Sequence, residues 1–399
     1  GLDPMTTDLV VADPERKEGT ICLAISPHLK SLGIRNRCRI FEIPKNCSYI
    51  IAEPRMKLYI HYAAEIYGIY LKYISKNDIH VYSIDEAFLD LSTYLDLYHK
   101  NFLEIGQMIQ NDILKTTKIT ATCGIGTNLY LAKIALDILA KHSKNYIATL
   151  NETSYQNQLG NHRPLTDFWM IGPGTACKLA DVGILTMNDI RNANPDYLFK
   201  MFGINSAYLI DHAWGKEPTT ISEIKQYKTR SHSLSSSQIL MRDYSKEEGL
   251  IILKEMIDLL CLELVDRNLL TCQIGLYVKY SKDTLPSFSK QMKLQIPTNS
   301  IRQLIAYYTP IYQEHIQRHG LVRKIGIAFS DLNDNSFQQM HLFYNEQLSD
   351  NDYAISKSVN QIKKKYGKNA IFKGSDLMNA ATTLERNCQL GGHKAGEKL

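Results

Sequence analysis

The sequence predicts an α+β protein of several domains, and three observations lead to this fold class. The chain has 399 residues, more than one hydrophobic core usually serves, so roughly two to four domains are expected. Between residues 80 and 140, strand-like and helix-like apolar periods follow in a ββαβα order, which predicts a sheet with helices packed on it. Residues 167–215, punctuated by Gly and Pro, predict a compact helical module, and residues 231–329 alternate strand and helix again.

The elements before residue 80 are short, apart from one long helix. In order, the sequence predicts a strand at 9–12, a turn at 13–18, a strand at 20–23, and helices at 27–32 and 56–74. Gly33 ends the first of these helices.

The middle of the chain carries the ββαβα order. Two strands joined by a turn are predicted within His80–Leu91, followed by a helix at 102–114, a strand at 118–123 and a helix at 129–140. Residues 216–230 are polar and basic without an apolar period, which predicts a linker.

A second α+β domain is predicted near the C-terminus. Its elements are strand 231–240, helix 246–267, strands 271–280 and 288–295, helix 299–317 and strand 321–329. Beyond residue 332 the chain is polar, with one predicted helix at 353–366 and a Gly/Lys-rich end that we expect to be mobile.

Composition excludes several classes of protein. Hydrophobic residues make up 44% and charged residues 22%, which excludes a disordered, collagen-like or membrane-embedded chain. The net charge of +5 is too small to establish a polyanion partner. The eight cysteines form no C-x-x-C pair, which argues against a zinc site and for reduced thiols in the cytoplasm. We also expect no secretory signal in this sequence.

The strongest motif places two adjacent carboxylates, Asp85 and Glu86, at the connection between two apolar strands. Neighbouring carboxylates are costly to desolvate because like charges raise each other's pKa, and a divalent cation offsets this cost. Mg²⁺ prefers carboxylate oxygens and takes further ligands from substrate phosphates. On this pattern alone, a two-metal site for phosphoryl transfer and a solvated acidic turn are equally good interpretations.

The run Tyr82-Ser-Ile-Asp-Glu-Ala-Phe-Leu-Asp90 resembles the catalytic signature of Y-family, translesion DNA polymerases, in particular their UmuC-like (ImpB/MucB/SamB) branch. The resemblance covers most of the chain and implies a right-hand-like fold. Its domains would be fingers at 1–54, a mixed-sheet palm at 55–164, a helical thumb at 165–220, a little finger at 221–333 and a C-terminal tail at 334–399. It favours Asp85 and Glu86 as catalytic ligands of two Mg²⁺ ions, with Mn²⁺ as an alternative.

The family pattern also contains a first catalytic Asp on an opening strand and an aromatic steric gate. This sequence lacks both, and it begins with Gly1 rather than Met. We therefore expect the sequence to begin part-way into a gene product or to carry a cloning remnant. A two-metal site without one carboxylate holds its cations loosely, so we expect this chain to bind DNA but to polymerise poorly.

The resemblance assigns three residues to the incoming nucleotide. Lys30 and Lys141 match positions that contact the triphosphate, and Ser83 belongs to the signature itself. Many relatives carry a Tyr where this chain has Pro27, a departure from the family pattern. A solvated lysine and a cation at a helix C-terminus are the alternative interpretations of Lys30 and Lys141.

Residues 168–179 resemble a helix-hairpin-helix that contacts duplex DNA. Gly172 and Gly174 would let backbone N–H groups approach a phosphate closely, and Lys178 would add a positive charge. A simple helix turn is the alternative, because Gly and Pro mark many such turns.

Two strands of the predicted little finger carry further candidates for DNA binding. One begins with Arg230 and His232 and continues in alternating serines, and the other carries Arg323 and Lys324. Such donors suit template phosphates without reading bases. An ordinary solvated sheet face is the alternative for each residue.

Gln339, Leu342 and Phe343 match the bacterial sliding-clamp peptide pattern Q-x-x-L-F. A pattern this short arises often by chance, so a short edge strand is the alternative. Its position behind a polymerase-like chain favours the clamp interpretation.

Together these features predict a bacterial DNA-directed DNA polymerase, a nucleotidyltransferase that acts in error-prone translesion synthesis and the SOS response. The primer 3′-hydroxyl would attack the α-phosphorus of a dNTP and release pyrophosphate. The expected partners are primer–template DNA, dNTP and the sliding clamp, without a membrane, at the cytoplasmic nucleoid. A non-catalytic accessory protein that binds damaged DNA and the clamp is one alternative, and a nucleotidyl cyclase is another.

Overall fold

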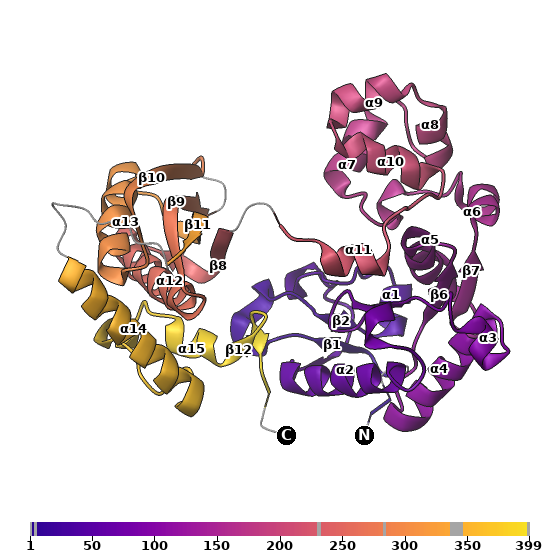
Figure 1. The fold of residues 1–399 in the computed structure, drawn as a ribbon, viewed down its shortest axis with the longest axis horizontal. Coiled ribbons are helices and arrows are strands. Elements are labelled where there is room, and N and C mark those ends of the chain that lie inside the picture. Colours follow the sequence, from indigo (N-terminus) through magenta and orange to yellow (C-terminus); the bar gives the residue numbers. More distant parts are fainter. Residues whose placement is uncertain (1, 4–5, 230–232, 282–284, 336–345, 397–399) are drawn as a thin grey trace. The chain divides into compact units, whose positions relative to one another are not determined.

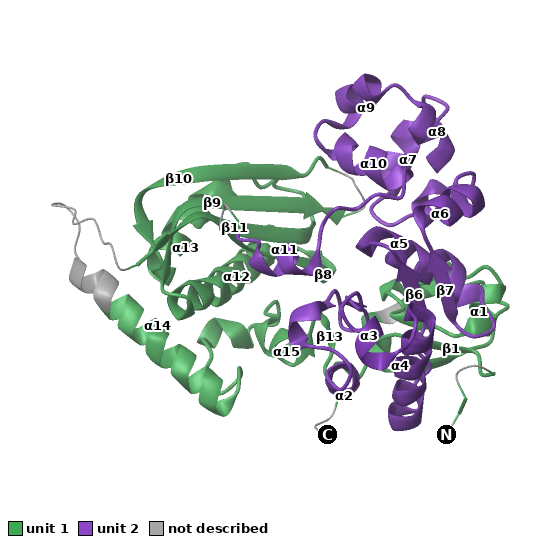
Figure 2. Cartoon of the chain, turned by 45° about the vertical axis from the view of Figure 1, so that its right-hand side comes forward, with its two compact units in different colours: residues 1–57, 229–399 green, residues 58–228 purple. Residues whose placement is uncertain are grey.

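A computed structural model describes residues 2–3, 6–229, 233–281, 285–335 and 346–396. The chain forms two compact units, each considered by itself: unit 1 comprises Gly1–Lys57 with Thr229–Leu399, and unit 2 comprises Leu58–Lys228 (Figure 2). Helices and sheets in both units confirm the α+β fold class. Across the described ranges, none of the helices has the length and apolar character that a bilayer span requires.

The N-terminal part of unit 1 is a small three-stranded sheet. Strand β1 (Leu9–Val11) lies in its centre, antiparallel to β2 (Ala24–Ile25) and parallel to β3 (Ile50–Ala52). The helix α1 (Pro27–Ser31) begins at a proline, whose fixed φ suits the first helical turn. The strand predicted at 20–23 is wrong, since this segment contributes only a single bridge, between Ile21 and Arg39.

The second part of unit 1 is an antiparallel sheet of four strands in the order β10-β9-β11-β8. Its elements are β8 (Ser233–Tyr244), α12 (Lys246–Asp266), β9 (Leu269–Tyr280), β10 (Phe288–Thr298), α13 (Ile301–His315) and β11 (Val322–Asp334). Apolar side chains of the two helices and of alternate strand positions form one buried core. The order of strands and helices predicted for this domain is thus confirmed, as Figure 1 shows.

The C-terminal residues pack onto the rest of unit 1. The predicted helix at 353–366 is confirmed, whereas the expectation that the Gly/Lys-rich end beyond it is mobile is wrong for the described residues up to 396. They form α14 (Glu346–Tyr366), α15 (Thr383–Asn387) and the strand pair β12 (Gln389–Leu390) and β13 (His393–Lys394). Helix α14 packs along α12, where the Asn360 side chain donates to the Leu262 carbonyl at 2.8 Å. A polar sequence is ordered here because its groups find partners on the folded domain.

Glu255 of α12 is the main anchor of this C-terminal segment. Its carboxylate is only 4% exposed and accepts hydrogen bonds from the backbone N–H groups of Thr382 and Thr383, at 3.0–3.1 Å. At the far end of the segment, the Lys394 ammonium lies 3.0 Å from Glu15 and 3.4 Å from Glu53. The segment therefore contacts both parts of unit 1: the region next to the N-terminal sheet, and the C-terminal domain formed by β8–β11 with α12 and α13.

Unit 2 begins with a long helix and two small sheets. These elements are α2 (Met56–Tyr70), β4 (Ile79–Val81), β5 (Ala87–Leu89), α3 (Leu95–Tyr98), α4 (Phe102–Thr117), β6 (Cys123–Gly126), α5 (Leu129–Ile134), β7 (Ile147–Leu150) and α6 (Glu152–Leu159). The ββαβα order is confirmed, but the single sheet that it predicted is not formed. Strand β5 pairs only with β4, and β6 only with β7, among the residues that the structure describes.

Two element boundaries in unit 2 differ from the prediction. The strand predicted at 118–123 begins only at Cys123, because Lys118 takes a left-handed conformation (φ 62°) at the end of α4. The helix predicted at 129–140 is α-helical only to Ile134 and continues as a π-helical turn over Ala135–Leu139.

The rest of unit 2 is helical. The helices are α7 (Pro173–Ala180), α8 (Met187–Asn192), α9 (Pro195–Phe202), α10 (Asn205–Ala213) and α11 (Ile221–Gln226). Helix α11 corrects the predicted linker at 216–230, since Ile221 is buried and the Lys225 ammonium donates to the carbonyls of Lys76 and Asn77. The division into four domains and a C-terminal tail, with boundaries after residues 54, 164, 220 and 333, stays a prediction.

Replacing Glu255 with Ala tests the anchor of the C-terminal segment. The change leaves buried donors of Thr382 and Thr383 without an acceptor, which costs about 1–3 kcal/mol for each unsatisfied group. We expect faster hydrogen exchange at these two amides and earlier proteolysis within 367–396. The control is Glu263→Ala on the same helix, whose partner Arg267 is exposed. Unchanged amide protection in the Glu255→Ala variant would contradict this role.

Candidate active site

The two signature carboxylates lie in the turn that joins β4 to β5. Val81 pairs with Ala87, and the backbone N–H groups of Tyr82 and Ser83 both donate to the Glu86 carbonyl, at 3.0 and 3.1 Å. These bonds close the turn tightly, so the predicted position of the acids between two apolar strands is confirmed.

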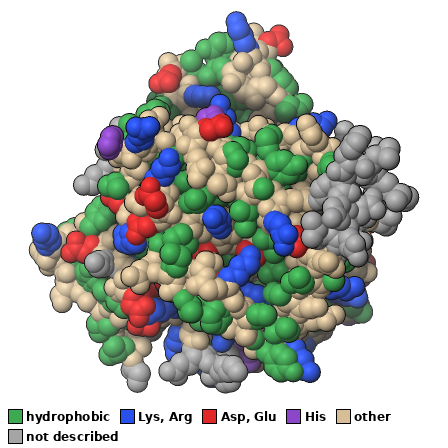
Figure 3. Space-filling model, turned by 90° about the vertical axis from the view of Figure 1, so that its left-hand side faces the viewer, with side chains coloured by type: hydrophobic (Ala, Val, Ile, Leu, Met, Phe, Trp, Pro, Cys, Tyr) green, Lys and Arg blue, Asp and Glu red, His purple; other side chains and the backbone are tan. Residues whose placement is uncertain are grey.

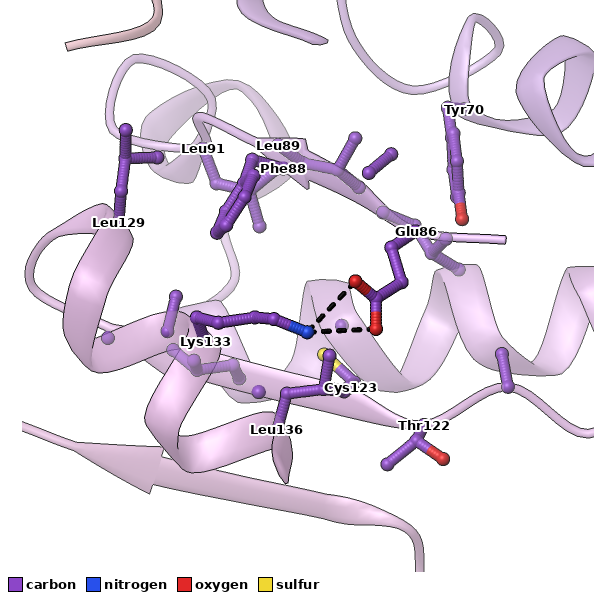
Figure 4. A pocket seen from close by; sticks show the side chains of 18 of the residues that line it. Tyr70, Glu86, Phe88, Leu89, Leu91, Thr122, Cys123, Leu129, Lys133 and Leu136 are labelled. Carbon is purple, nitrogen blue, oxygen red and sulfur yellow. Dashed lines mark hydrogen bonds and ion pairs between the residues drawn. The ribbon is translucent and has the colours of Figure 1, made fainter. Parts of the chain in front are cut away.

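Asp85 and Glu86 have different surroundings. Asp85 is exposed, and the Ser83 hydroxyl donates to its Oδ1 at 2.7 Å. The Glu86 side chain is 27% exposed, and both of its oxygens accept from the Lys133 ammonium, at 2.8 and 2.9 Å. Figure 4 shows Lys133 reaching from α5 toward the Glu86 carboxylate. One carboxylate is therefore open to solvent while the other is already paired with a cation.

Lys133 belongs to a row of alternating charges. Its ammonium also lies 3.1 Å from Oδ2 of Asp137, and Oδ1 of Asp137 lies 2.8 Å from the Lys141 ammonium. Burial by itself lowers the pKa of Lys133, but its hydrogen bonds and charge interactions with Glu86 and Asp137 outweigh burial and hold that pKa above its ordinary value. Lys133 is therefore charged at neutral pH although its side chain is 8% exposed.

The turn opens into a cavity of about 1700 Å³ in unit 2. All residues of β5 and β6 line it, together with one face of α2, one face of α4 and the lysines Lys133 and Lys141. Strands β5 and β6 each have one edge without a strand partner within the described chain. The cavity thus combines an apolar wall with a few charged groups, which is typical of ligand sites.

Two glycines set the position of α5 and hence of Lys133. A Cβ atom on Gly124 or Gly126 would lie 2.2 Å from the backbone of Ala132, so only glycine lets β6 pack this closely on α5. Asn128 caps the helix by accepting from the Leu131 N–H at 2.9 Å. The G-x-G pair, which does not belong to a dinucleotide-binding motif, serves the packing of the site.

The residues predicted for the nucleotide are distributed over both units. Ser83 and Lys141 line the cavity together with Asp85 and Glu86. Lys30 lies in unit 1, where it is exposed at the end of α1. The structure therefore groups Ser83 and Lys141 with the acids, and the role of Lys30 stays a prediction.

The DNA-binding candidates are mostly exposed where they are described. Gly172 caps α7 and Gly174 lies in its first turn, with open space where a Cβ atom would be, and Lys178 is exposed. Arg323 lies 3.4 Å from Asp243, and the Lys324 ammonium lies 5.6 Å from the centre of the Tyr277 ring. Arg230 and His232 lie outside the described residues, as do Gln339, Leu342 and Phe343.

An aromatic bridge next to the acids was not predicted from the sequence. Trp169 Nε1 donates to the Tyr82 hydroxyl at 3.0 Å, and the ring of Trp169 stacks at 6.4 Å on His212, which stacks at 4.0 Å on Tyr130. The Tyr82 ring also lies 5.7 Å from the Lys133 ammonium. These contacts fix the acidic turn to α5 and α10.

Lys133 and Asp137 were also missed, although the sequence carries a signal for them. Lys133 is a single cation among the apolar residues 129–136 of a helix, and such a buried cation requires a counter-ion. The Lys133–Asp137 spacing of four residues supplies one on the same helix face. The second counter-ion, Glu86, is 47 positions away and could not be read from the spacing.

The carboxylates fit a hard divalent cation such as Mg²⁺. Both supply the oxygen ligands that this ion prefers, and the Lys133 ammonium already occupies a cation position on Glu86. Within the described ranges there is no cluster of three or more His, Cys, Asp or Glu side chains able to hold an ion. An ion bound by these two carboxylates would need further oxygen ligands, as Mg²⁺ does in sites where substrate phosphates complete its coordination.

Replacing Lys133 with Met tests the energetic weight of the ion pair. The change leaves Glu86 half-buried without a partner, so we expect the urea midpoint of unit 2 to fall by the equivalent of about 2 kcal/mol. Adding Glu86→Gln should restore part of the loss, since the uncompensated charge is then removed. The control is Lys72→Met, which removes a lysine that is 55% exposed and leaves Asp112 its hydrogen bonds from Tyr73 and Thr116, so it should cost less than about 1 kcal/mol. Equal losses in both single variants would contradict this assignment.

Comparison with known proteins places the chain in a family. The impB/mucB/samB family model matches residues 2–137, and the model of its C-terminal domain matches residues 231–342. The putative UV-damage repair protein UvrX of Bacillus subtilis (strain 168) is 31% identical over 99% of this chain and 93% of its own length. DNA polymerase IV 2 of the same organism is 30% identical over 96% of this chain and 92% of its own.

A solved structure agrees with these relatives. The Y-family DNA polymerase chimera Dbh-Dpo4(243-245)-Dbh matches with a TM-score of 0.63 and 25% identity, over 83% of this chain and 94% of its own. The predicted resemblance is thus confirmed, and the chain belongs to the impB/mucB/samB family of Y-family DNA polymerases.

Proposed function

We propose that this protein is an error-prone, translesion DNA-directed DNA polymerase of DNA damage tolerance, and that the cavity of unit 2 is its nucleotidyl-transfer site. The single observation that carries the proposal is the pair Asp85 and Glu86 at a turn that opens into the same cavity as Lys133 and Lys141. Relatives named as DNA polymerase IV and as a UV-damage repair protein support the same activity.

The side chains of the cavity have distinct roles in this reaction. Asp85 and Glu86 would hold Mg²⁺, or Mn²⁺ in its place, and two such ions supply Lewis-acid stabilisation to phosphoryl transfer when bound. The Ser83 hydroxyl orients the Asp85 carboxylate, and Lys133 holds that of Glu86. Lys141 offers its ammonium to the triphosphate of the incoming dNTP. The primer 3′-hydroxyl loses its proton and its oxygen attacks the α-phosphorus, the bond from the α-phosphorus to the oxygen bridging to the β-phosphate breaks, and pyrophosphate departs.

Primer–template DNA is the proposed partner of two further surfaces. The N-terminal turn of α7, with Gly172, Gly174 and Lys178, suits a duplex phosphate in the manner of a helix-hairpin-helix. In the C-terminal domain, Lys324 and the exposed serines of β8 suit template phosphates. On the face drawn in Figure 3, basic and acidic side chains are interspersed.

The bacterial sliding clamp is a further proposed partner, and the cytoplasmic nucleoid is the proposed location. The clamp assignment relies on Gln339, Leu342 and Phe343, which lie between β11 and α14 outside the described residues.

Replacing Leu342 and Phe343 with Ala should remove clamp binding in a pull-down with purified clamp, because both apolar anchors are lost. Full retention of binding by the double variant would disprove the clamp contact.

The catalytic assignment is tested with Asp85→Asn and Glu86→Gln. Each change removes a charged ligand, so we expect Mg²⁺-dependent primer extension to fall more than about 10²-fold. DNA affinity, measured by fluorescence anisotropy, should change less than about twofold, because these acids do not contact the phosphates that supply most of the affinity. The matched control is Asp96→Asn, which removes an exposed carboxylate of α3 outside the cavity.

The outcomes separate the candidate functions. Extension by both acid variants at the rate of the unchanged protein would disprove the site. DNA binding without template-directed dNTP incorporation by the unchanged protein would favour the accessory-protein alternative. Formation of a cyclic nucleotide from a triphosphate would favour the cyclase alternative.

A further inference from the structure

The charged row in unit 2 shares its partners between neighbours. Glu86 has Lys133 as its cation, Lys133 has Glu86 and Asp137 as its anions, and Asp137 has Lys133 and Lys141 as its cations. Lys141 is the exposed end of this row, with 49% of its side chain open to solvent, whereas Lys133 at its centre is 8% exposed. Asp137 and Lys133 thus connect Lys141 to Glu86 by a continuous series of ion pairs.

The row follows the i,i+4 spacing that brings side chains together on one helix face. Lys133 belongs to α5, Asp137 lies in the π-helical turn Ala135–Leu139, and Lys141 lies in the 3-10 turn Ala140–His142 that follows. The ion-pair distances are 3.1 Å from Lys133 to Asp137 and 2.8 Å from Asp137 to Lys141.

We propose that Asp137 is a positioning residue that couples capture of a triphosphate by Lys141 to cation binding by Glu86. This inference rests on the proposed function, which assigns the triphosphate to Lys141 and the metal to Glu86. Without nucleotide, Lys133 donates to both oxygens of Glu86, so a metal ion that binds there competes with an ammonium.

Triphosphate binding changes the balance at Asp137. When phosphate oxygens pair with the Lys141 ammonium, Lys133 remains as the one described cation partner of Asp137. Lys133 then pairs more strongly with Asp137 and less strongly with Glu86. Glu86 is then open to the divalent ion that accompanies the triphosphate. Because such coupling is reciprocal, a metal on Glu86 strengthens triphosphate binding at Lys141 by the same factor.

The coupling is measured without nucleotide, with Mn²⁺ as the probe and electron paramagnetic resonance of free Mn²⁺ as the readout. Lys141→Met mimics loss of this ammonium to phosphate, so we expect Mn²⁺ affinity to rise about fivefold or more, the usual size of such couplings. In an Asp137→Asn background, Lys141→Met should change Mn²⁺ affinity less than about twofold, since the relay is cut. Lys144→Met, which removes another exposed lysine of the same region, controls for simple loss of positive charge.

The double-mutant cycle distinguishes the relay from a through-space charge effect. Equal gains from Lys141→Met with and without Asp137, or a gain from Lys144→Met as large as that from Lys141→Met, would overturn the relay. Glu86→Gln reports separately on the proposed function. If it leaves Mn²⁺ affinity unchanged, the metal site itself is wrong. If Glu86→Gln lowers Mn²⁺ affinity but the effects of Lys141→Met and Asp137→Asn on that affinity simply add, the metal site is supported and the relay is contradicted. Circular dichroism confirms that each variant is folded.

Discussion

The ion pair between Lys133 and Glu86 is the interaction on which the organisation of unit 2 depends. A lysine that is 8% exposed is retained only where anions compensate its charge, and Glu86 and Asp137 do so from two sides. The same pair fixes the acidic turn of β4 and β5 against α5. Without this ion pair, the negative charges of Asp85 and Glu86 would repel each other at neighbouring positions of the turn, with no cation to compensate them.

Close backbone packing makes this ion pair possible. Gly124 and Gly126 let β6 approach α5 to a distance that any Cβ atom would prevent, and the aromatic contacts of Trp169 and His212 hold the turn and α5 to the helical module. Residues from separated stretches of unit 2, between Tyr59 and Ile221, thus line one cavity. Packing contacts between distant parts of the chain hold the polar groups of this site in position, as is usual for a preorganised site.

The C-terminal segment shows the same principle in unit 1. Its sequence is polar and lacks a regular apolar pattern. Even so, Glu255 accepts from the backbone donors of Thr382 and Thr383 inside the domain, and Lys394 pairs with Glu15 and Glu53, which lie next to the strands of the N-terminal sheet. Buried donors are paired almost without exception in folded proteins, so one buried carboxylate can determine where a polar segment lies. The segment links two parts of unit 1 that are far apart in sequence.

The sequence alone determined the fold class, the order of most helices and strands, and the position of Asp85 and Glu86 in a turn, because periodicity and motif spacing are local properties. Only the tertiary structure decided that Lys133 pairs with Glu86, that the predicted palm forms two small sheets, and that residues 346–396 dock on unit 1. It also replaced part of the predicted helix at 129–140 with a π-helical turn. These features depend on contacts between residues distant in sequence, which no local pattern records.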